Sequence, residues 1–138
     1  LCKKEGISTA IETSLYLYDE EILKSLDLVM ADFKIWNDND HKKYTGVSNK
    51  QIKENFKKLD ELNVPFIVRT PLIPEITDNA ENITNIRNFV KDFKNIIKYE
   101  LLNYNPLGDS KLKALGKEPI TFKINAKSVK EMQKYADL

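Results

Sequence analysis

Apolar positions recur along the chain in two alternating spacings. Short runs of apolar and β-branched residues predict strands, and apolar side chains three and four positions apart predict helices. The strands expected from this pattern cover residues 7–13, 28–34, 64–73 and 96–102. The expected helices cover residues 19–26, 38–44, 48–62 and 78–93, and a last one begins at Asn125. Strands that alternate with helices predict an α/β fold whose parallel strands are joined by right-handed crossovers.

Strand–helix repeats of this kind build either an open doubly wound sheet or an arc of a barrel. Four strands end in polar side chains, at Glu12/Thr13, Asp32/Lys34, Arg69 and Asn105. An arc of a barrel would bring these four ends to one mouth. We therefore expect residues 1–138 to form a single domain, a partial (β/α) barrel with about four parallel βα units.

The strand expected at 28–34 combines an apolar face with a charged one. Side chains alternate across a strand, so Met30, Asp32 and Lys34 share one face while Ala31 and Phe33 share the other. Ligands gather at the carboxyl ends of parallel strands, where Asp32 and Lys34 would lie. The alternative interpretation is a solvated ion pair on an edge strand.

Together, the six polar residues would suit a small zwitterionic or anionic ligand. Carboxylates such as Asp32 bind an ammonium group or a cation, and Lys34 and Arg69 bind a carboxylate. Lys34 could instead be a Schiff-base lysine, because barrel aldolases place such a lysine at a strand end.

Three features set expectations for boundaries and loops. Ser48 and Gln51 have the spacing of a helix capping box, and Pro71 and Pro74 are expected to end the third strand. The segment from Pro106 to Thr121 is expected to be a long loop, of a length that usually marks function or mobility.

Composition excludes several classes of protein. Lys and Arg number 22 and Asp and Glu 21, so the net charge of +1 favours neither nucleic acid nor an anionic membrane as a partner. The single cysteine, Cys2, cannot form an internal disulfide or hold zinc or an iron–sulfur cluster by itself. The single histidine, His41, is expected to be a capping or packing residue in the turn before Gly46. A cytoplasmic location is expected by default, because the sequence has no signal peptide and no long apolar run.

The first six residues resemble the end of a helix, closed by Gly6, whose beginning is not in the sequence. We therefore expect the chain to be a segment of a longer protein. The edge of the first strand would then be exposed, which predicts self-association of the isolated segment.

Five segments carry a family resemblance. They are residues 3–7 (KKEGI), 27–34 (DLVMADFK), His41 with 45–49 (TGVSN), 68–74 (VRTPLIP) and 101–108 (LLNYNPLG). In this order they closely resemble the carboxyl-terminal part of the glycyl-radical-enzyme activating enzymes, the group of pyruvate formate-lyase activating enzyme. The resemblance implies a radical S-adenosylmethionine enzyme with a partial (β/α)6 barrel. It also implies a [4Fe–4S] cluster on a CxxxCxxC motif, hydrogen abstraction from a glycine loop of a partner such as pyruvate formate-lyase, and flavodoxin or ferredoxin as electron donor.

The resemblance also implies roles for individual residues. Lys34 and Arg69 match contacts to the methionyl or ribose part of the cofactor, and Asn105 stands where the pyruvate formate-lyase activator has a histidine. A monovalent-cation site beside the cofactor carboxylate is matched by four residues: Glu12, Thr13, Met30 through its carbonyl, and Asp32. Glu12 departs from the aspartate that close relatives often have.

The CxxxCxxC motif and the Gly-Gly-Glu stretch of the family are missing from these 138 residues. The sequence therefore contains no residue that we expect to be catalytic and no cluster ligand, and the isolated segment is expected to be inactive. A further alternative is that the segment is a non-catalytic module that docks a partner.

Overall fold

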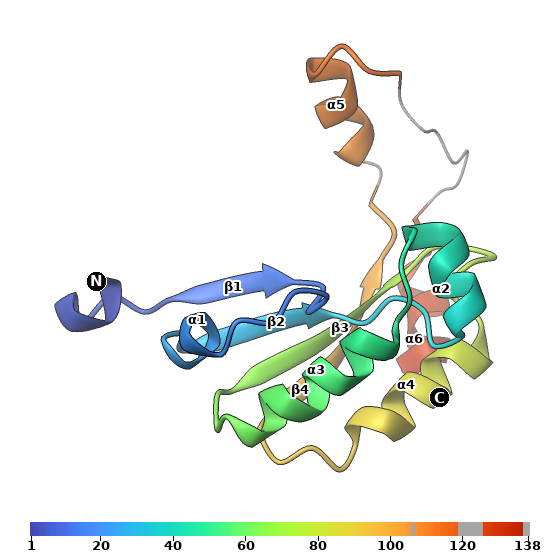
Figure 1. The fold of residues 1–138 in the computed structure, drawn as a ribbon. Helices are drawn as coiled ribbons and strands as arrows, with labels where there is room; N and C mark the ends of the chain where they lie inside the picture. The colour runs from blue at the N-terminus through green and yellow to red at the C-terminus, as the bar shows by residue number, and fades with distance from the viewer. Residues whose placement is uncertain (106, 119–125, 137–138) are drawn as a thin grey trace.

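The computed structural model describes residues 1–105, 107–118 and 126–136. Four parallel strands form one sheet in the order β1-β2-β3-β4, and helices alternate with them along the chain (Figure 1). The strands are β1 (Ala10–Thr13), β2 (Leu28–Asp32), β3 (Phe66–Leu72) and β4 (Ile96–Asn103). The helices are η1 (Cys2–Glu5), α1 (Glu20–Lys24), α2 (Asp38–Thr45), α3 (Lys50–Glu61), α4 (Ala80–Val90), α5 (Leu107–Ala114) and α6 (Val129–Ala136). The predicted α/β alternation is confirmed.

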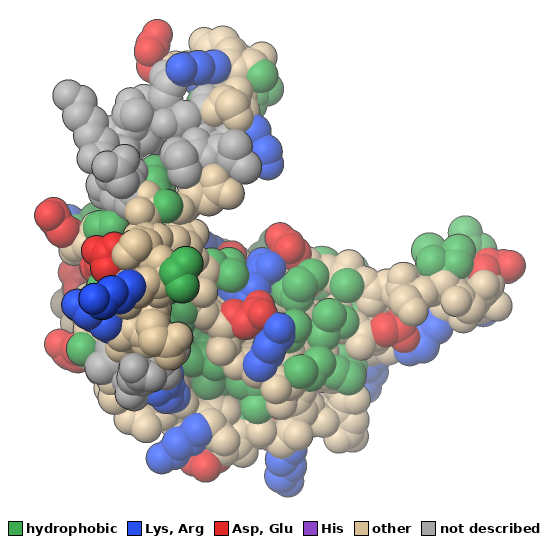
Figure 2. All heavy atoms as spheres, turned by 180° about the vertical axis from the view of Figure 1, so that it is seen from behind, with side chains coloured by type: hydrophobic (Ala, Val, Ile, Leu, Met, Phe, Trp, Pro, Cys, Tyr) green, Lys and Arg blue, Asp and Glu red, His purple; other side chains and the backbone are tan. Residues whose placement is uncertain are grey.

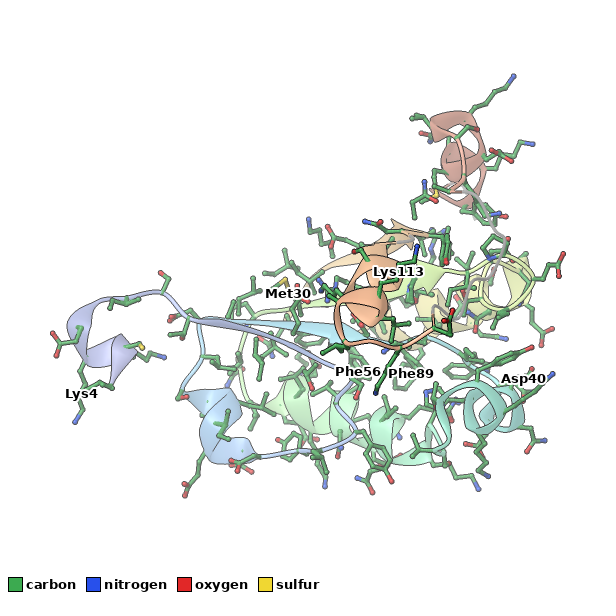
Figure 3. The ribbon with its side chains drawn as sticks, turned by 90° about the horizontal axis from the view of Figure 1, so that it is seen from above. Lys4, Met30, Asp40, Phe56, Phe89 and Lys113 are labelled. Atoms are coloured by element: carbon green, nitrogen blue, oxygen red, sulfur yellow. The ribbon has the colours of Figure 1, made fainter. Side chains whose placement is uncertain are left out.

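One face of the sheet is covered by α1, α3 and α4 (Figure 1). Aromatic rings fill the layer between them: Phe33 stacks on Phe56 at a centroid distance of 5.5 Å and meets Phe89 edge-on at 5.8 Å. Figure 3 shows Phe56 and Phe89 on this side of the sheet and Met30 on the other. The strand residues buried here are Val29, Ala31, Phe66 and Val68, each without exposed surface. This covered face is the hydrophobic core.

The opposite face is left open by these helices. Paired residues of parallel strands point to the same side, and the register pairs Glu12 with Met30 and Asp32 with Arg69. Figure 2 shows this side, with acidic and basic side chains in the middle and hydrophobic ones around them. The alternation predicted for residues 28–34 is therefore confirmed in β2, which has one apolar and one charged face.

The prediction that Pro71 ends the third strand is wrong, because β3 continues through it to Leu72. The Phe33 amide donates to the Arg69 carbonyl at 2.9 Å. In a parallel ladder the Phe33 carbonyl would then accept from the amide of residue 71, but Pro71 has no N–H. The Thr70 hydroxyl donates to the Phe33 carbonyl instead, at 2.6 Å. A neighbouring side chain thus replaces the donor that proline lacks.

The predicted capping box at Ser48 is also wrong. Helix α3 begins after Asn49. The Ser48 hydroxyl donates to Asp38, and its oxygen accepts from the Lys50 amide at 3.2 Å rather than from Gln51, as a capping box requires. Gln51 donates its side-chain amide to Asn55. Ser48 and Gln51 therefore bond to other residues and not to each other.

Two expectations concern the end of the chain. The expected loop from Pro106 contains helix α5, which stands away from the sheet (Figure 1). Asn125, the expected start of the last helix, lies outside the described residues, and α6 is capped by Ser128 and Glu131. None of the described helices is long and apolar enough to cross a bilayer.

An ion pair between Lys127 and Asp78 attaches the start of α6 to the loop between β3 and α4. The charged groups lie 2.7 Å apart, and the two side chains are only 13% and 15% exposed. The carboxylate of Asp78 raises the pKa of Lys127 above its ordinary value. Asn103, at the end of β4, holds the same segment by exchanging two hydrogen bonds with the Lys127 backbone.

Candidate functional site

Arg69 is at the centre of the charged residues on the open face. Its Nε and Nη2 donate to Asp32 Oδ1 at 3.1 and 3.0 Å, and its Nη1 donates to Glu12 Oε1 at 3.0 Å. Nη1 also lies 3.8 Å from the Met30 sulfur. One guanidinium group on β3 therefore connects all of the first three strands of the sheet.

Lys34 completes this group from the carboxyl end of β2. Its Nζ lies 3.4 Å from Asp32 Oδ2, so the two oxygens of Asp32 face two different cations. We call Glu12, Asp32, Lys34 and Arg69 the charged cluster. Its two carboxylates and two cations balance, and the Lys34 side chain is 36% exposed at the mouth of the open face.

The charges of the cluster stabilise one another. The hydrogen bond and charge of Arg69 hold the pKa of Glu12 below its ordinary value. The same hydrogen bond from Arg69 to Glu12 is the main cause that raises the pKa of Arg69. Because Glu12 is 65% exposed and Arg69 only 12% exposed, water screens the outer end of the cluster far more than its centre.

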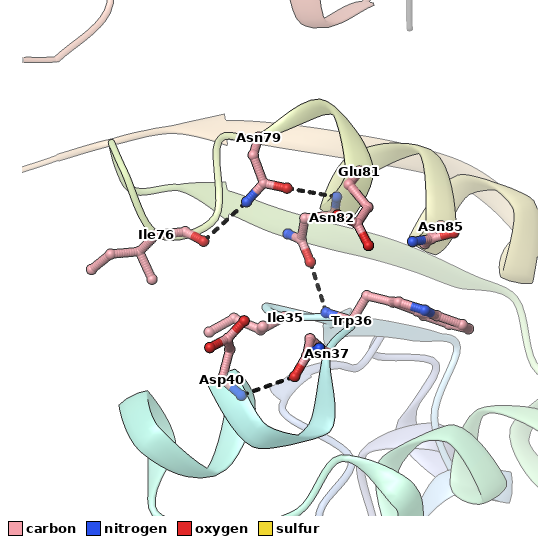
Figure 4. A pocket seen from close by; sticks show the side chains of 9 residues that line it. All are labelled: Ile35, Trp36, Asn37, Asp40, Ile76, Asn79, Glu81, Asn82 and Asn85. Carbon is pink, nitrogen blue, oxygen red and sulfur yellow. Dashed lines mark hydrogen bonds between the residues drawn. The ribbon is translucent and has the colours of Figure 1, made fainter.

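Buried amides hold the backbone that carries Lys34. Asn82, in the first turn of α4 and only 5% exposed, donates through Nδ2 to the Lys34 carbonyl at 3.1 Å. Its Oδ1 accepts from the Trp36 amide at 2.7 Å, as Figure 4 shows. Asn49, the residue just before α3, donates to the carbonyls of Ile35 and Trp36, both at 2.8 Å. The segment is therefore fixed from two helices.

Sequence reasoning missed these amides, although a signal was present. Asn82 precedes Ile83 and lies one turn before Ile86, so it shares their stripe on the predicted helix. A polar residue on an apolar stripe needs a buried partner, and the backbone around Lys34 supplies it.

A cavity of about 380 Å³ adjoins the cluster, between the loop after β1 and helix α2. The cavity is lined by Ser14, Tyr16, Asp32, Lys34, His41, Tyr44, Thr45, Val47 and Ile52. Of these, His41 is buried and its Nδ1 lies 2.7 Å from the Val47 carbonyl oxygen, which confirms its predicted packing role. The cavity gives the charged cluster room for a small ligand.

Two predicted site residues do not join the cluster by their side chains. Thr13 alternates to the covered face of β1, and its hydroxyl accepts from the Leu15 amide at 3.0 Å. Asn105 follows β4 at the same carboxyl edge of the sheet and is exposed. The structure thus brings together Glu12, Met30, Asp32, Lys34 and Arg69.

The metal groups implied by the family do not fit the residues as they stand. Glu12 and Asp32 already accept from Arg69, and the Thr13 hydroxyl lies on the other face, so these side chains do not form one cage for a cation. Cys2, exposed in η1, is the one cysteine of the sequence, whereas a [4Fe–4S] cluster on a CxxxCxxC motif needs three thiolates. Within the described ranges, no three His, Cys, Asp or Glu side chains converge as metal ligands.

Comparison with known proteins finds activating enzymes among the relatives of this chain. The pyruvate formate-lyase-activating enzyme of Clostridium pasteurianum is 39% identical over 83% of this chain and 49% of its own length. Pyruvate formate-lyase 1-activating enzyme of Escherichia coli K12 is 38% identical over 85% of this chain and 50% of its own length. The chain therefore spans about half the length of these relatives. No model of a protein family matches it.

A solved structure confirms the fold. A domain of pyruvate-formate lyase-activating enzyme from Bacteroides vulgatus superimposes with a TM-score of 0.76 over 99% of this chain and 77% of that one, at 20% identity. The arc of parallel strands is therefore a partial barrel, as predicted. By sequence and by fold, the chain belongs to the glycyl-radical-enzyme activating enzymes of the pyruvate formate-lyase activating enzyme group, within the radical S-adenosylmethionine enzymes.

Proposed function

We propose that the protein containing this chain uses S-adenosylmethionine to place a radical on a glycine of a partner enzyme such as pyruvate formate-lyase, with flavodoxin or ferredoxin as electron donor. The chain would supply one wall of the cofactor site. The observation that supports this role is the charged cluster, in which Lys34 and Arg69 face Asp32 beside a cavity at the strand ends. S-adenosylmethionine carries a carboxylate, an ammonium and a sulfonium group, so its charges are complementary to both signs in the cluster.

Each residue of the cluster has a capacity that suits this ligand. The Lys34 ammonium has three donors and pairs with Asp32 alone among the described residues, so it can bind the cofactor carboxylate. Arg69 has five N–H donors and uses four in the contacts described above, which leaves one for a ligand. Asn105, exposed after the end of β4, would be a further contact to the cofactor. When bound, the cofactor supplies the radical chemistry, and this chain's residues bind and orient it.

The test is calorimetric titration of S-adenosylmethionine into the full natural polypeptide and its Lys34→Met variant. Loss of a charge-assisted contact should weaken binding roughly ten- to a hundredfold. The matched control is Lys57→Met, because Lys57 lies exposed on α3 and pairs only with its neighbour Glu54. Equal affinity of the Lys34→Met and Lys57→Met variants would contradict the proposal. Labelling of Lys34 by borohydride with a carbonyl substrate would instead support a Schiff-base lyase.

The 138-residue chain alone should bind no cluster, since it has one cysteine. Anaerobic incubation with iron and sulfide, followed by absorbance and electron spin resonance spectroscopy, measures this directly. The control is the full natural polypeptide under the same conditions. A stoichiometric [4Fe–4S] signal from the short chain would show that the cluster does not need the missing motif.

A further inference from the structure

The two carboxylates of the charged cluster are bridged by an internal cation, the guanidinium of Arg69. Asp32 Oδ1 accepts two of its N–H groups and Glu12 Oε1 accepts a third, all within 3.1 Å. The Arg69 side chain is 12% exposed, so the group lies largely inside the sheet face rather than in solvent. This is the place where the family resemblance puts a free monovalent cation.

The length of Glu12 makes this bridge possible. Strands β1 and β3 are separated by β2 and are therefore about 9–10 Å apart. Glu12 pairs with Met30 and Arg69 with Asp32, so the guanidinium crosses β2 diagonally, past the Met30 sulfur at 3.8 Å, to meet Glu12. An aspartate at position 12 is one methylene shorter, and its carboxylate would stop short of Nη1.

Few oxygen atoms around the charged cluster can bind a free cation, and two positive side chains lie close to those that could. Asp32 Oδ2 faces the Lys34 ammonium at 3.4 Å while Oδ1 is occupied by Arg69. The Thr13 hydroxyl lies on the covered face and accepts from Leu15. A sodium or potassium ion would therefore meet two fixed positive groups at the carboxylates that should bind it, and like charges so close repel.

We propose that the Arg69 guanidinium replaces the free monovalent cation in this site. Glu12 determines this replacement, because its side chain is long enough to reach Arg69. The inference rests on the proposed function, because it concerns how the cofactor site is charged. It implies that S-adenosylmethionine binds equally well with and without sodium or potassium. It also implies that a Glu12→Asp variant, whose shorter carboxylate no longer binds Arg69 Nη1, needs sodium or potassium to bind S-adenosylmethionine tightly.

The experiment is calorimetric titration of S-adenosylmethionine into the full natural polypeptide, in tetramethylammonium, sodium and potassium chloride at equal ionic strength. The wild-type affinity should agree within about twofold in all three salts. The Glu12→Asp affinity should be at least about fivefold higher in sodium or potassium than in tetramethylammonium. The matched control, Glu12→Gln, keeps the side-chain length and should remain insensitive to the salt.

A second measurement needs no cofactor. Thallium(I) substitutes for potassium, so its nuclear resonance broadens when it binds. With the wild-type 138-residue chain, the thallium resonance should not broaden. With the Glu12→Asp variant it should broaden, and added potassium should reverse the broadening. Reversible broadening with the wild type, or a salt-dependent wild-type affinity, would overturn the inference. Failure to bind S-adenosylmethionine in every salt would refute the proposed function, while the thallium measurement would still test the role of Arg69.

Discussion

The two faces of the sheet differ in nearly every physical respect. On the covered face, Val29, Phe66 and Val68 have no exposed surface and pack against aromatic rings from α3 and α4. On the open face, alternate residues of the same strands carry a charged cluster in which Asp32 is 26% exposed and Glu12 65% exposed. The first three strands thus carry the apolar core on one side and the charged cluster on the other.

The segment after β2 connects the two faces. Phe33 points into the aromatic core, and the next residue, Lys34, belongs to the charged cluster. Asn82 and Thr70 bond the carbonyls of these two residues from neighbouring elements. Packing on the covered face therefore determines where the charge on the open face lies, and the three predictions below test how far the faces are separate.

The largest effect is expected on the covered face, for Phe56→Ala. Phe56 is fully buried and contacts the rings of Phe33, Phe66 and Phe89. Its truncation should lower the free energy of unfolding by about 3–5 kcal/mol, because a cavity remains where the ring was. Urea unfolding followed by circular dichroism measures this.

The matched control for Phe56→Ala is Leu17→Ala. Leu17 is 84% exposed, so its truncation should change the free energy of unfolding little. Similar losses for the two variants would mean that the covered face does not contain the stabilising core.

A smaller effect is expected at the junction, for Asn82→Ala. The change removes a side chain that is only 5% exposed. It leaves the Trp36 amide without its acceptor and the Lys34 carbonyl without the donor from Asn82. We expect a loss of about 2–3 kcal/mol in the free energy of unfolding, since unpaired buried polar groups retain their desolvation cost. Hydrogen exchange of the Trp36 amide should become faster in the same variant.

Asn85→Ala is the control for this substitution. Asn85 lies on the same helix, lines the pocket beside Asn82 in Figure 4 and is half-buried. No hydrogen bond from its side chain is present among the described residues, so its loss should change stability by less than about 0.5 kcal/mol. An equal effect of the two variants would show that the amide bonds to the Lys34 segment contribute nothing.

The smallest effect is expected on the open face, for Glu12→Gln. Arg69 holds the pKa of Glu12 below 4.5, its ordinary value, so the folded state favours the ionised form. The wild type should therefore be more stable than the variant above about pH 4.5, and this advantage should disappear as the pH falls through the lowered pKa. Thermal unfolding of both proteins between neutral pH and about pH 3 measures it. An advantage that grew toward low pH would contradict the ion pair.

The site could be predicted in part because of strand alternation. The pattern around Met30, Asp32 and Lys34 assigned charged and apolar side chains to opposite faces, and parallel order predicted that Arg69 would lie near them. Thr13 was placed at the correct end of its strand, but the same alternation puts its side chain on the other face from Glu12. The functional roles of these residues stay predictions.

The local sequence by itself determined the order of the four strands and of the helices between them, because hydrophobic periodicity depends only on the spacing of residues along the chain. Only the tertiary structure decided which polar groups meet. Pro71 stays in β3 because Thr70 replaces its missing donor, and Ser48 donates to Asp38, ten positions away, without forming the predicted capping box. Glu12 reaches Arg69, 57 positions away, because β2 lies between their strands at a distance that a glutamate can cross. Such contacts depend on register and strand spacing, which are properties of the assembled sheet.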